Sequence, residues 1–141
     1  SSDLEDCGAD SFDESDDYPA IIARAAQNLA RDAAQGIRSR AILIGASGQG
    51  EAIVANRFPG VRAAVFYGNP AVKQTDAAGH ELDLIQSTRA HNDANALSIG
   101  ARFVSADEAR AAVGAWLTAS FSGEERHVRR ITAIDQFPSH A

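Results

Sequence analysis

The chain has 141 residues, a formal net charge of −6, 45% hydrophobic residues and only 6% aromatic residues. This length suits a single domain spanning residues 1–141, and the alanine-rich, aromatic-poor composition favours an α/β fold over a β-sandwich. A net acidic chain without a basic, aromatic-laced face is a poor nucleic-acid binder, and no apolar run approaches the ~20 residues of a membrane helix. We therefore expect neither a nucleic-acid nor a membrane partner.

The first segment of the chain is strongly acidic. Residues 1–17 hold eight acidic side chains and no basic one, a pattern typical of a solvated acidic lead-in. Cys7 is the single cysteine, which excludes an internal disulfide and favours a reducing, cytoplasmic setting. Within this segment, residues 4–9 are predicted to form a short strand.

Helical and strand patterns then alternate along the chain. A helix is predicted to begin at Pro19 and to end at Gly36, because apolar residues recur between them at helical spacing. The apolar run 41–44 predicts a strand covered on both faces. The later elements are a helix over 51–58, a strand over 61–67, a loop over 68–80, a helix over 81–92 and a strand over 96–104. Two more helices are predicted to begin at capping-box patterns. The first begins at Ser105–Glu108 and points Trp116 and Leu117 inward, and the second begins at Ser122–Glu125 and runs to about residue 137.

This alternation predicts an α/β fold with a mostly parallel sheet and helices on both of its faces. In such sheets, ligands bind beyond the carboxyl ends of the strands. The loop GASGQG, residues 45–50, follows the strand 41–44 directly and therefore lies at such an end.

The glycine loop combines groups suited to binding an anion and to moving a proton. Backbone N–H groups around Gly48 and Gly50 and the Ser47 hydroxyl can donate to a developing negative charge. Glu51 follows at once and is a candidate general base. The alternative for Glu51 is that of a favourable acidic residue in the first turn of a helix.

Three arginines are candidate phosphate ligands. Arg126 and Arg130 lie four residues apart on one face of the last predicted helix, and Arg102 ends a strand. The alternative is a solvated basic face that pairs with Glu124 or Glu125.

His91 and Asn92 precede the strand that begins at residue 96. Histidine suits proton transfer near neutral pH, and the alternative is a helix cap or a surface residue. No group of side chains has metal-ligand spacing, so we predict no metal and no cofactor.

Together these segments resemble the B-type ribose-5-phosphate isomerases, the family that also holds galactose- and allose-phosphate isomerases. The matching runs are GASGQGEAIVANRFPGVRAA (45–64), HNDANALSIGAR (91–102), SGEERHVRRI (122–131) and DYP (17–19). The resemblance implies a Rossmann-like three-layer αβα sandwich and a small phosphorylated sugar as the substrate. It also implies a dimer that builds each site from two subunits.

The resemblance further implies aldose–ketose isomerisation, of ribose 5-phosphate above all, through a cis-enediolate. One branch of the family carries a cysteine base at the position of Gly45, and a second branch places a glutamate base at the position of Glu51. Ser47 and the N–H groups near Gly48 and Gly50 would stabilise the enediolate. By similarity, His91 would help to open the furanose ring and Asn92 would contact the substrate, while the phosphate ligands would be Arg102, Arg126 and Arg130.

The sequence departs from the family at its start. The strand, Asp-His-bearing turn and helix that precede the segment resembling LEDCGA are absent from it, so we expect a fragment whose leading segment is separate. Two alternatives to the isomerase remain open at this point. One is a non-catalytic module that binds a sugar phosphate or a nucleotide, and the other is a subunit of a heteromeric hexose-phosphate isomerase.

Overall fold

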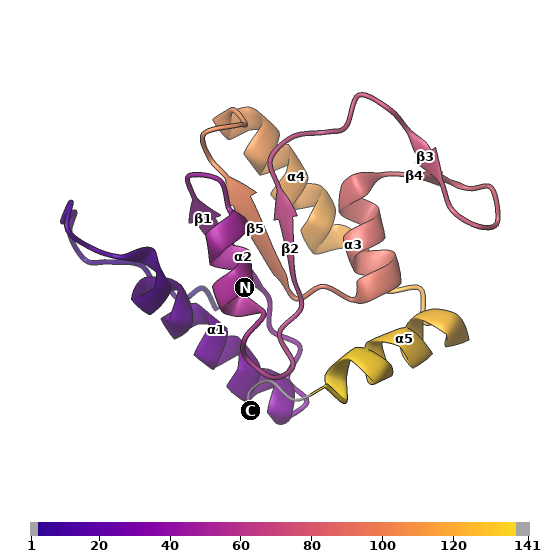
Figure 1. Cartoon of the computed structure of the whole chain (residues 1–141), viewed down its shortest axis with the longest axis horizontal. Helices are drawn as coiled ribbons and strands as arrows, with labels where there is room; N and C mark the ends of the chain where they lie inside the picture. Colours follow the sequence, from indigo (N-terminus) through magenta and orange to yellow (C-terminus); the bar gives the residue numbers. More distant parts are fainter. Residues whose placement is uncertain (1–2, 138–141) are drawn as a thin grey trace.

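The computed structural model describes residues 3–137, in which helices and strands alternate (Figure 1). The elements in chain order are α1 (Tyr18–Ala34), β1 (Ala41–Gly45), α2 (Gln49–Ala55), β2 (Ala63–Phe66), β3 (Gln74–Thr75), β4 (Glu81–Leu82), α3 (Leu84–Asn92), β5 (Ala96–Gly100), α4 (Ala106–Thr118) and α5 (Glu125–Asp135). The predicted α/β alternation is confirmed. No helix in this part of the chain has the length and apolar character that a membrane span requires.

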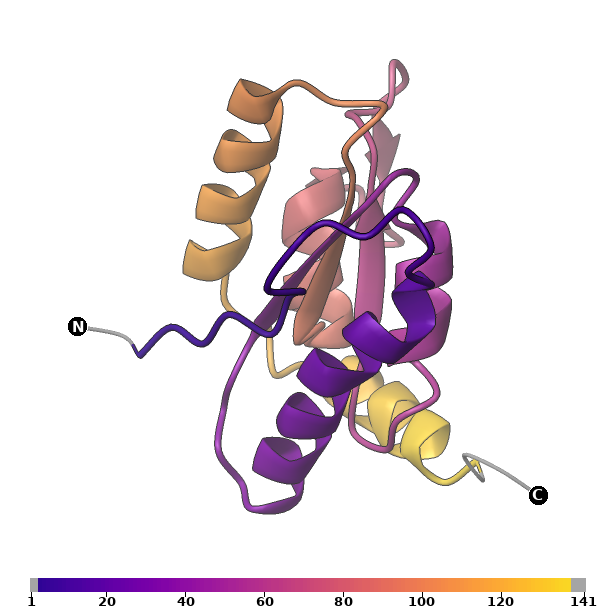
Figure 2. The same cartoon turned by 90° about the vertical axis from the view of Figure 1, so that its left-hand side faces the viewer.

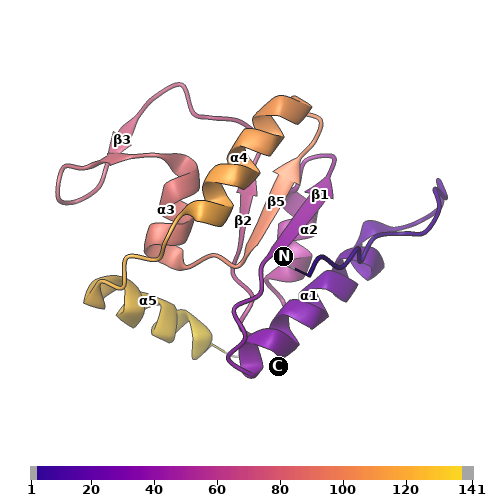
Figure 3. The same cartoon turned by 180° about the vertical axis from the view of Figure 1, so that it is seen from behind.

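Three parallel strands form the central sheet in the order β1-β5-β2. Ala96 of β5 pairs with Ala41 on one side and with Ala63 on the other, so all three strands start level. Parallel neighbours require crossover connections, and helices provide them here. Seen edge-on, α1 and α2 cover one face of the sheet while α3 and α4 cover the other (Figure 2). From behind, α4 lies across the sheet (Figure 3). The predicted three-layer sandwich is therefore confirmed.

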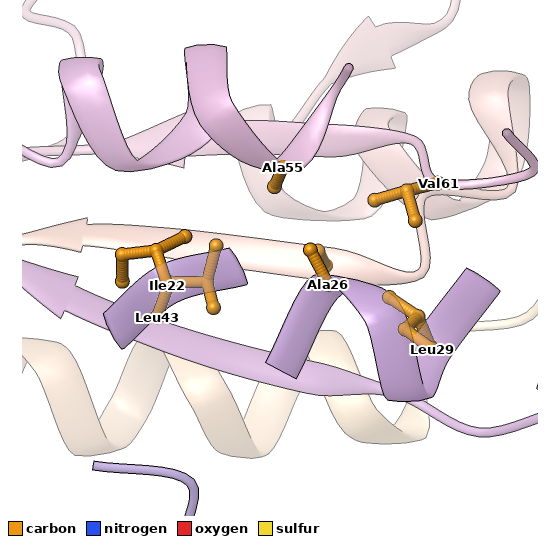
Figure 4. Packing of buried hydrophobic residues seen from close by; sticks show 7 residues of the cluster. Ile22, Ala26, Leu29, Leu43, Ala55 and Val61 are labelled. Atoms are coloured by element: carbon orange, nitrogen blue, oxygen red, sulfur yellow. The ribbon is translucent and has the colours of Figure 1, made fainter. Parts of the chain in front are cut away.

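One hydrophobic core lies between the sheet and the α1–α2 layer (Figure 4). Alanines in both helices allow α1 and α2 to pack closely against each other and against the sheet. The buried members of this core are Ile22, Ala26, Leu29, Leu43, Ala55, Val61 and Ala96.

A second core lies on the opposite face, under α3 and α4. Successive residues of β5 point to opposite faces, so Leu97 and Ile99 enter this core while Ala96 enters the first one. Trp116 of α4 is fully buried here, and the guanidinium of Arg40 lies 5.5 Å from its ring centroid. All five residues of β5 are buried, as expected for a central strand with both faces covered.

Several local sequence signals have the structural role that was predicted. Pro19 lies in the first turn of α1, and Gly36 follows that helix with a φ of 75°. The Ser105 side chain accepts a hydrogen bond from the Glu108 N–H at 3.1 Å, which caps α4.

Three predicted element assignments are wrong. Residues 4–9 form no strand, because this segment has no strand beside it and contacts α1 through Asn28 and Arg24 instead. The predicted loop 68–80 contains β3, which pairs with β4 in an antiparallel hairpin. The following helix consequently begins only at Leu84, after Asp83 has capped it by accepting from the Gln86 N–H at 3.0 Å.

Three further details differ from expectation. Ile44 is 68% exposed, because β1 lies at the edge of the sheet and α4 packs on β5 rather than on it. Leu117 is 48% exposed, since Trp116 fills the space beneath α4. The capping box at Ser122 does not form: α5 begins at Glu125 with Glu124 as its N-cap, and the Ser122 hydroxyl contacts His127 instead.

Candidate active site

The glycine loop lies at the carboxyl end of β1 and packs directly on the end of β5. Gly48 is buried with a φ of 75°, and a Cβ on it would lie 3.0 Å from the backbone N of Gly100. The buried Ser98 hydroxyl donates to the Gly48 carbonyl at 2.7 Å. Glycine is therefore needed at position 48 both for its left-handed backbone and for this close approach.

Glu51 lies in the first turn of α2 and is only 7% exposed. Its carboxylate rests against Gly45, the last residue of β1, where any Cβ would overlap it. Within residues 3–137 the carboxylate forms no hydrogen bond or ion pair. Its oxygens are not among the fully enclosed polar atoms without a partner, so they are open to a ligand at the loop.

Hydrogen-bond donors surround the mouth of this loop. The Ser47 hydroxyl accepts from the Gln49 N–H at 3.2 Å, so its own proton can be donated outward. The first N–H groups of a helix have no intrahelical partner, and those of α2, including Gly50, start here. The Tyr18 hydroxyl lies over Gly50, where a Cβ would overlap it. Sequence reasoning assigned no role to Tyr18, although it belongs to the DYP run.

Arg102 lies at the same end of the sheet as the glycine loop. Its backbone N–H donates to the Ala46 carbonyl at 3.0 Å, and its side chain is exposed. The strand predicted over 96–104 ends at Gly100, because the chain turns here and the Phe103 N–H donates to the Gly100 carbonyl. The carboxyl end of the sheet thus brings together a carboxylate, a hydroxyl, backbone donors and one guanidinium.

His91 and Asn92 lie at the opposite end of the sheet, where its strands begin. They are the last residues of α3, and β5 starts at Ala96 and carries the chain back toward the glycine loop. Five strand residues at about 3.3 Å each separate the two ends of the strand by roughly 13 Å or more. The structure of one chain therefore does not bring His91 and Asn92 to Glu51.

The turn after Asn92 is held by a cluster of charges around Asp93. Asp93 has a φ of 43°, a left-handed conformation that only short polar residues and glycine adopt readily. Its carboxylate accepts from Arg89 Nη1 at 2.8 Å and lies 3.5 Å from Arg62 Nη2. Arg62 Nε also donates to the Asn92 carbonyl at 2.9 Å. This cluster fixes the direction in which α3 presents His91 and Asn92.

Helix α5 carries the other predicted arginines beside His91. Arg126 Nε lies 3.0 Å from Glu124 Oε2, whereas the Arg130 side chain is exposed. Between them, His127 is buried with its ring centroid 4.4 Å from that of His91. Burial lowers the pKa of His127, and the neighbouring His91 lowers it further. Sequence reasoning gave His127 no role of its own.

The predicted site residues therefore form two separate groups. One group lies at the carboxyl end of the sheet and consists of Glu51, Ser47, Gly48, Gly50 and Arg102. The other group lies on α3 and α5 at the opposite end and consists of His91, Asn92, Arg126 and Arg130. Among the described residues, no three His, Cys, Asp or Glu side chains are grouped in a way that could hold a metal ion.

A cavity of about 630 Å³ also lies at the end of the sheet where the strands begin, but the arginines that line it already have structural partners. Arg40 donates to the carbonyls of Trp116 and Leu117, and Arg89 donates to the Ala94 carbonyl. The Trp116 and Leu117 carbonyls belong to the last turn of α4, where intrahelical donors run out, and Ala94 lies in the turn between α3 and β5. These arginines are therefore accounted for by structural contacts.

Comparison with known proteins shows which family the chain matches. Residues 1–134 match the sequence model of the Ribose/Galactose Isomerase family. Ribose-5-phosphate isomerase B of Mycolicibacterium paratuberculosis is 36% identical over 132 residues, which cover 94% of this chain and 72% of that protein. The D-erythrulose-4-phosphate isomerase 2 of Mycolicibacterium smegmatis is 30% identical, with 93% of this chain and 75% of that protein covered.

A solved structure shares the fold. Ribose-5-phosphate isomerase B of Mycoplasma genitalium, with bound ribulose 5-phosphate, superposes with a TM-score of 0.73 at 30% identity. The superposition covers 92% of this chain and 74% of that one. The family match, the relatives and the shared sandwich show that this chain belongs to the ribose/galactose isomerase family.

Proposed function

We propose that this chain interconverts ribose 5-phosphate and ribulose 5-phosphate with Glu51 as the base. The observation that carries the proposal is the buried Glu51 carboxylate, held against Gly45 at the carboxyl end of β1 beside a set of hydrogen-bond donors. Parallel α/β sheets bind their ligands at this end. The relative from Mycoplasma genitalium, with its bound ribulose 5-phosphate, supports this choice of sugar.

In the proposed reaction the proton on C2 of the open-chain aldose moves to Glu51 and leaves a cis-enediolate. The same carboxyl group returns a proton to C1, and the hydroxyl proton on O2 moves to O1, so the ketose forms with no net gain or loss of atoms. Negative charge develops on the two oxygens in between. The Ser47 hydroxyl and the free N–H groups of α2 would stabilise that charge.

The position of the base depends on the absence of a side chain at residue 45. The Glu51 carboxylate fills the space that such a side chain would take. A cysteine there, as in the other branch of the family, would therefore place its sulfur where this chain places a carboxylate. Two sequence solutions would thus bring a base to the same point above the end of β1.

The second half of the proposed site comes from a partner copy of the chain. His91 and Asn92 lie at the end of the sheet opposite Glu51, and Arg130 is exposed on α5 beside them. Contacts in a two-fold dimer are reciprocal, so a dimer that places the His91 end of one copy against the Glu51 end of its partner completes two equivalent sites. Arg102 of one copy and Arg126 and Arg130 of the other would then bind the phosphate.

We treat residues 1–141 as one isomerase domain, in which two cores share a single sheet. We place it in the cytoplasm on the evidence of Cys7, a free cysteine.

The direct test is interconversion of the two pentose phosphates by the wild type and by Glu51→Gln. Loss of the base is expected to reduce kcat by ~10²–10⁴-fold. Glu108→Gln is the matched control, because Glu108 also lies in the first turn of a helix but is exposed. Full turnover by Glu51→Gln would show that another group is the base. Binding of the sugar phosphate without turnover by the wild type would instead identify a non-catalytic module.

The length of the sugar is tested in the same assay with erythrulose 4-phosphate, the substrate named for one relative. A higher kcat/KM for the four-carbon sugar than for ribose 5-phosphate would overturn the choice of a pentose.

A further inference from the structure

We propose that His127, together with Ser122, is a positioning residue for His91 that supports opening of the sugar ring and not the proton transfer at C1 and C2. This inference rests on the proposed isomerase function. It assigns a role to a buried imidazole that lies far from Glu51 in the same chain.

The contact between the two imidazoles joins two elements that carry different parts of the site. His91 is in the last turn of α3, His127 is in the first turns of α5, and their ring planes are inclined by 30° at 4.4 Å between centroids. This geometry lies close to the range of offset-stacked aromatic pairs. The Ser122 N–H also donates to the Ala90 carbonyl at 3.1 Å, which ties the start of α5 to the end of α3.

The hydrogen bonds of Ser122 hold the His127 ring in a fixed orientation. The Ser122 hydroxyl accepts from the Glu124 N–H at 3.2 Å and lies 2.9 Å from His127 Nδ1. A hydroxyl carries one donor and two acceptor lone pairs, so Ser122 can accept from Glu124 and still form its hydrogen bond with Nδ1. Ser122 is therefore used to orient a ring, which explains why it does not cap α5.

The surroundings of His127 keep it neutral. It is 4% exposed, and the charged or titratable groups around it are His91 from α3, Arg126 and Arg130 from α5, and Glu124, the N-cap of α5. Burial is the main cause of its lowered pKa, and the adjacent His91 adds to the effect. A neutral His127 packs against His91 without charge repulsion, so it can hold that ring in place.

Ring opening is the step that needs the His91 imidazole. The C1–O4 bond of the furanose breaks, O4 gains a proton, and the O1 hydroxyl loses one as the aldehyde forms. An imidazole that gives a proton to O4 and recovers one from O1 completes this step with no net change. Ribulose 5-phosphate, by contrast, cannot close a furanose ring, because its O5 is esterified. Proton exchange at C1 of the ketose therefore reports the Glu51 step without any ring chemistry.

The experiment compares two reactions in wild type, His127→Gln and Ser122→Ala, all as full-length chains. One is isomerisation of ribose 5-phosphate. The other is exchange of the C1 proton of ribulose 5-phosphate with deuterated water, followed by NMR. His80→Gln is the control, because the His80 side chain is 79% exposed on the hairpin.

We expect His127→Gln to slow isomerisation on the order of 10²-fold, the usual scale for a reacting group displaced by about 1 Å, while C1 exchange changes little. Ser122→Ala removes only the hydrogen bond to Nδ1 and leaves the packing of the ring, so it should show the same split to a smaller extent. An equal loss in both reactions, or no loss in either, would overturn the inference while leaving the isomerase assignment intact. A wild type that catalyses neither reaction would overturn the proposed function itself, and the inference with it.

Discussion

Replacement of Gly45 by alanine is expected to remove most of the activity without unfolding the protein. A Cβ on residue 45 would overlap both oxygens of the Glu51 carboxylate, so the carboxylate has to move by about an ångström or more. A displacement of ~1 Å can cost on the order of 10²-fold in rate. Gly45 does not have a positive φ, so alanine fits its backbone, and crowding should lower the free energy of unfolding by only ~1–3 kcal/mol.

The assay is kcat/KM for ribose 5-phosphate together with the midpoint of thermal unfolding. Gly114→Ala is the control: Gly114 lies within α4, and a Cβ there has nothing within 4 Å. That substitution should raise the free energy of unfolding by ~0.5–1 kcal/mol and leave activity unchanged. Wild-type kcat/KM in Gly45→Ala would refute the argument, since the carboxylate would then not depend on the space above residue 45. Gly45→Cys combined with Glu51→Ala should in turn exceed the activity of Glu51→Ala alone.

Three further results are expected. Ser47→Ala should lower kcat by ~10²–10³-fold with little change in KM, as for loss of an oxyanion donor, and a change confined to KM would contradict this role. Asp93→Ala should lower the free energy of unfolding by ~1–3 kcal/mol, measured in urea, because buried guanidinium donors lose their acceptor and a left-handed residue loses its polar side chain. Mixing inactive Glu51→Gln with inactive Arg130→Ala should restore roughly a quarter of wild-type activity, since half of randomly mixed dimers are mixed and each holds one intact site. An inactive mixture in which mixed dimers form would place the whole site in one chain.

Much of the local structure follows from the sequence, because its signals act over only a few residues. Pro19 and Gly36 bound the first long helix through φ preferences that are properties of the residues themselves. The glycine loop between an apolar run and Glu51 likewise indicates where a strand ends and a helix begins. From the regular alternation of these signals, the parallel sandwich could be predicted.

Strand formation at residues 4–9 could not be judged in this way, because a strand needs a neighbour in space. No local pattern shows whether one is present, and the segment contacts α1 instead. The capping box at Ser122 failed for a related reason. The same hydroxyl suits a helix N-cap or a buried imidazole, and the packing of α5 on α3 selected His127.

The sequence by itself therefore determined most helices and central strands, the parallel sandwich and the place of the glycine loop. Tertiary structure decided which candidate residues meet. It placed the Glu51 carboxylate against Gly45, and it placed His91 at the opposite end beside His127. The physical reason is the direction of the elements, because α3 runs antiparallel to the strands. Residues at the end of α3 therefore lie about one strand length away from residues at the carboxyl ends of the strands.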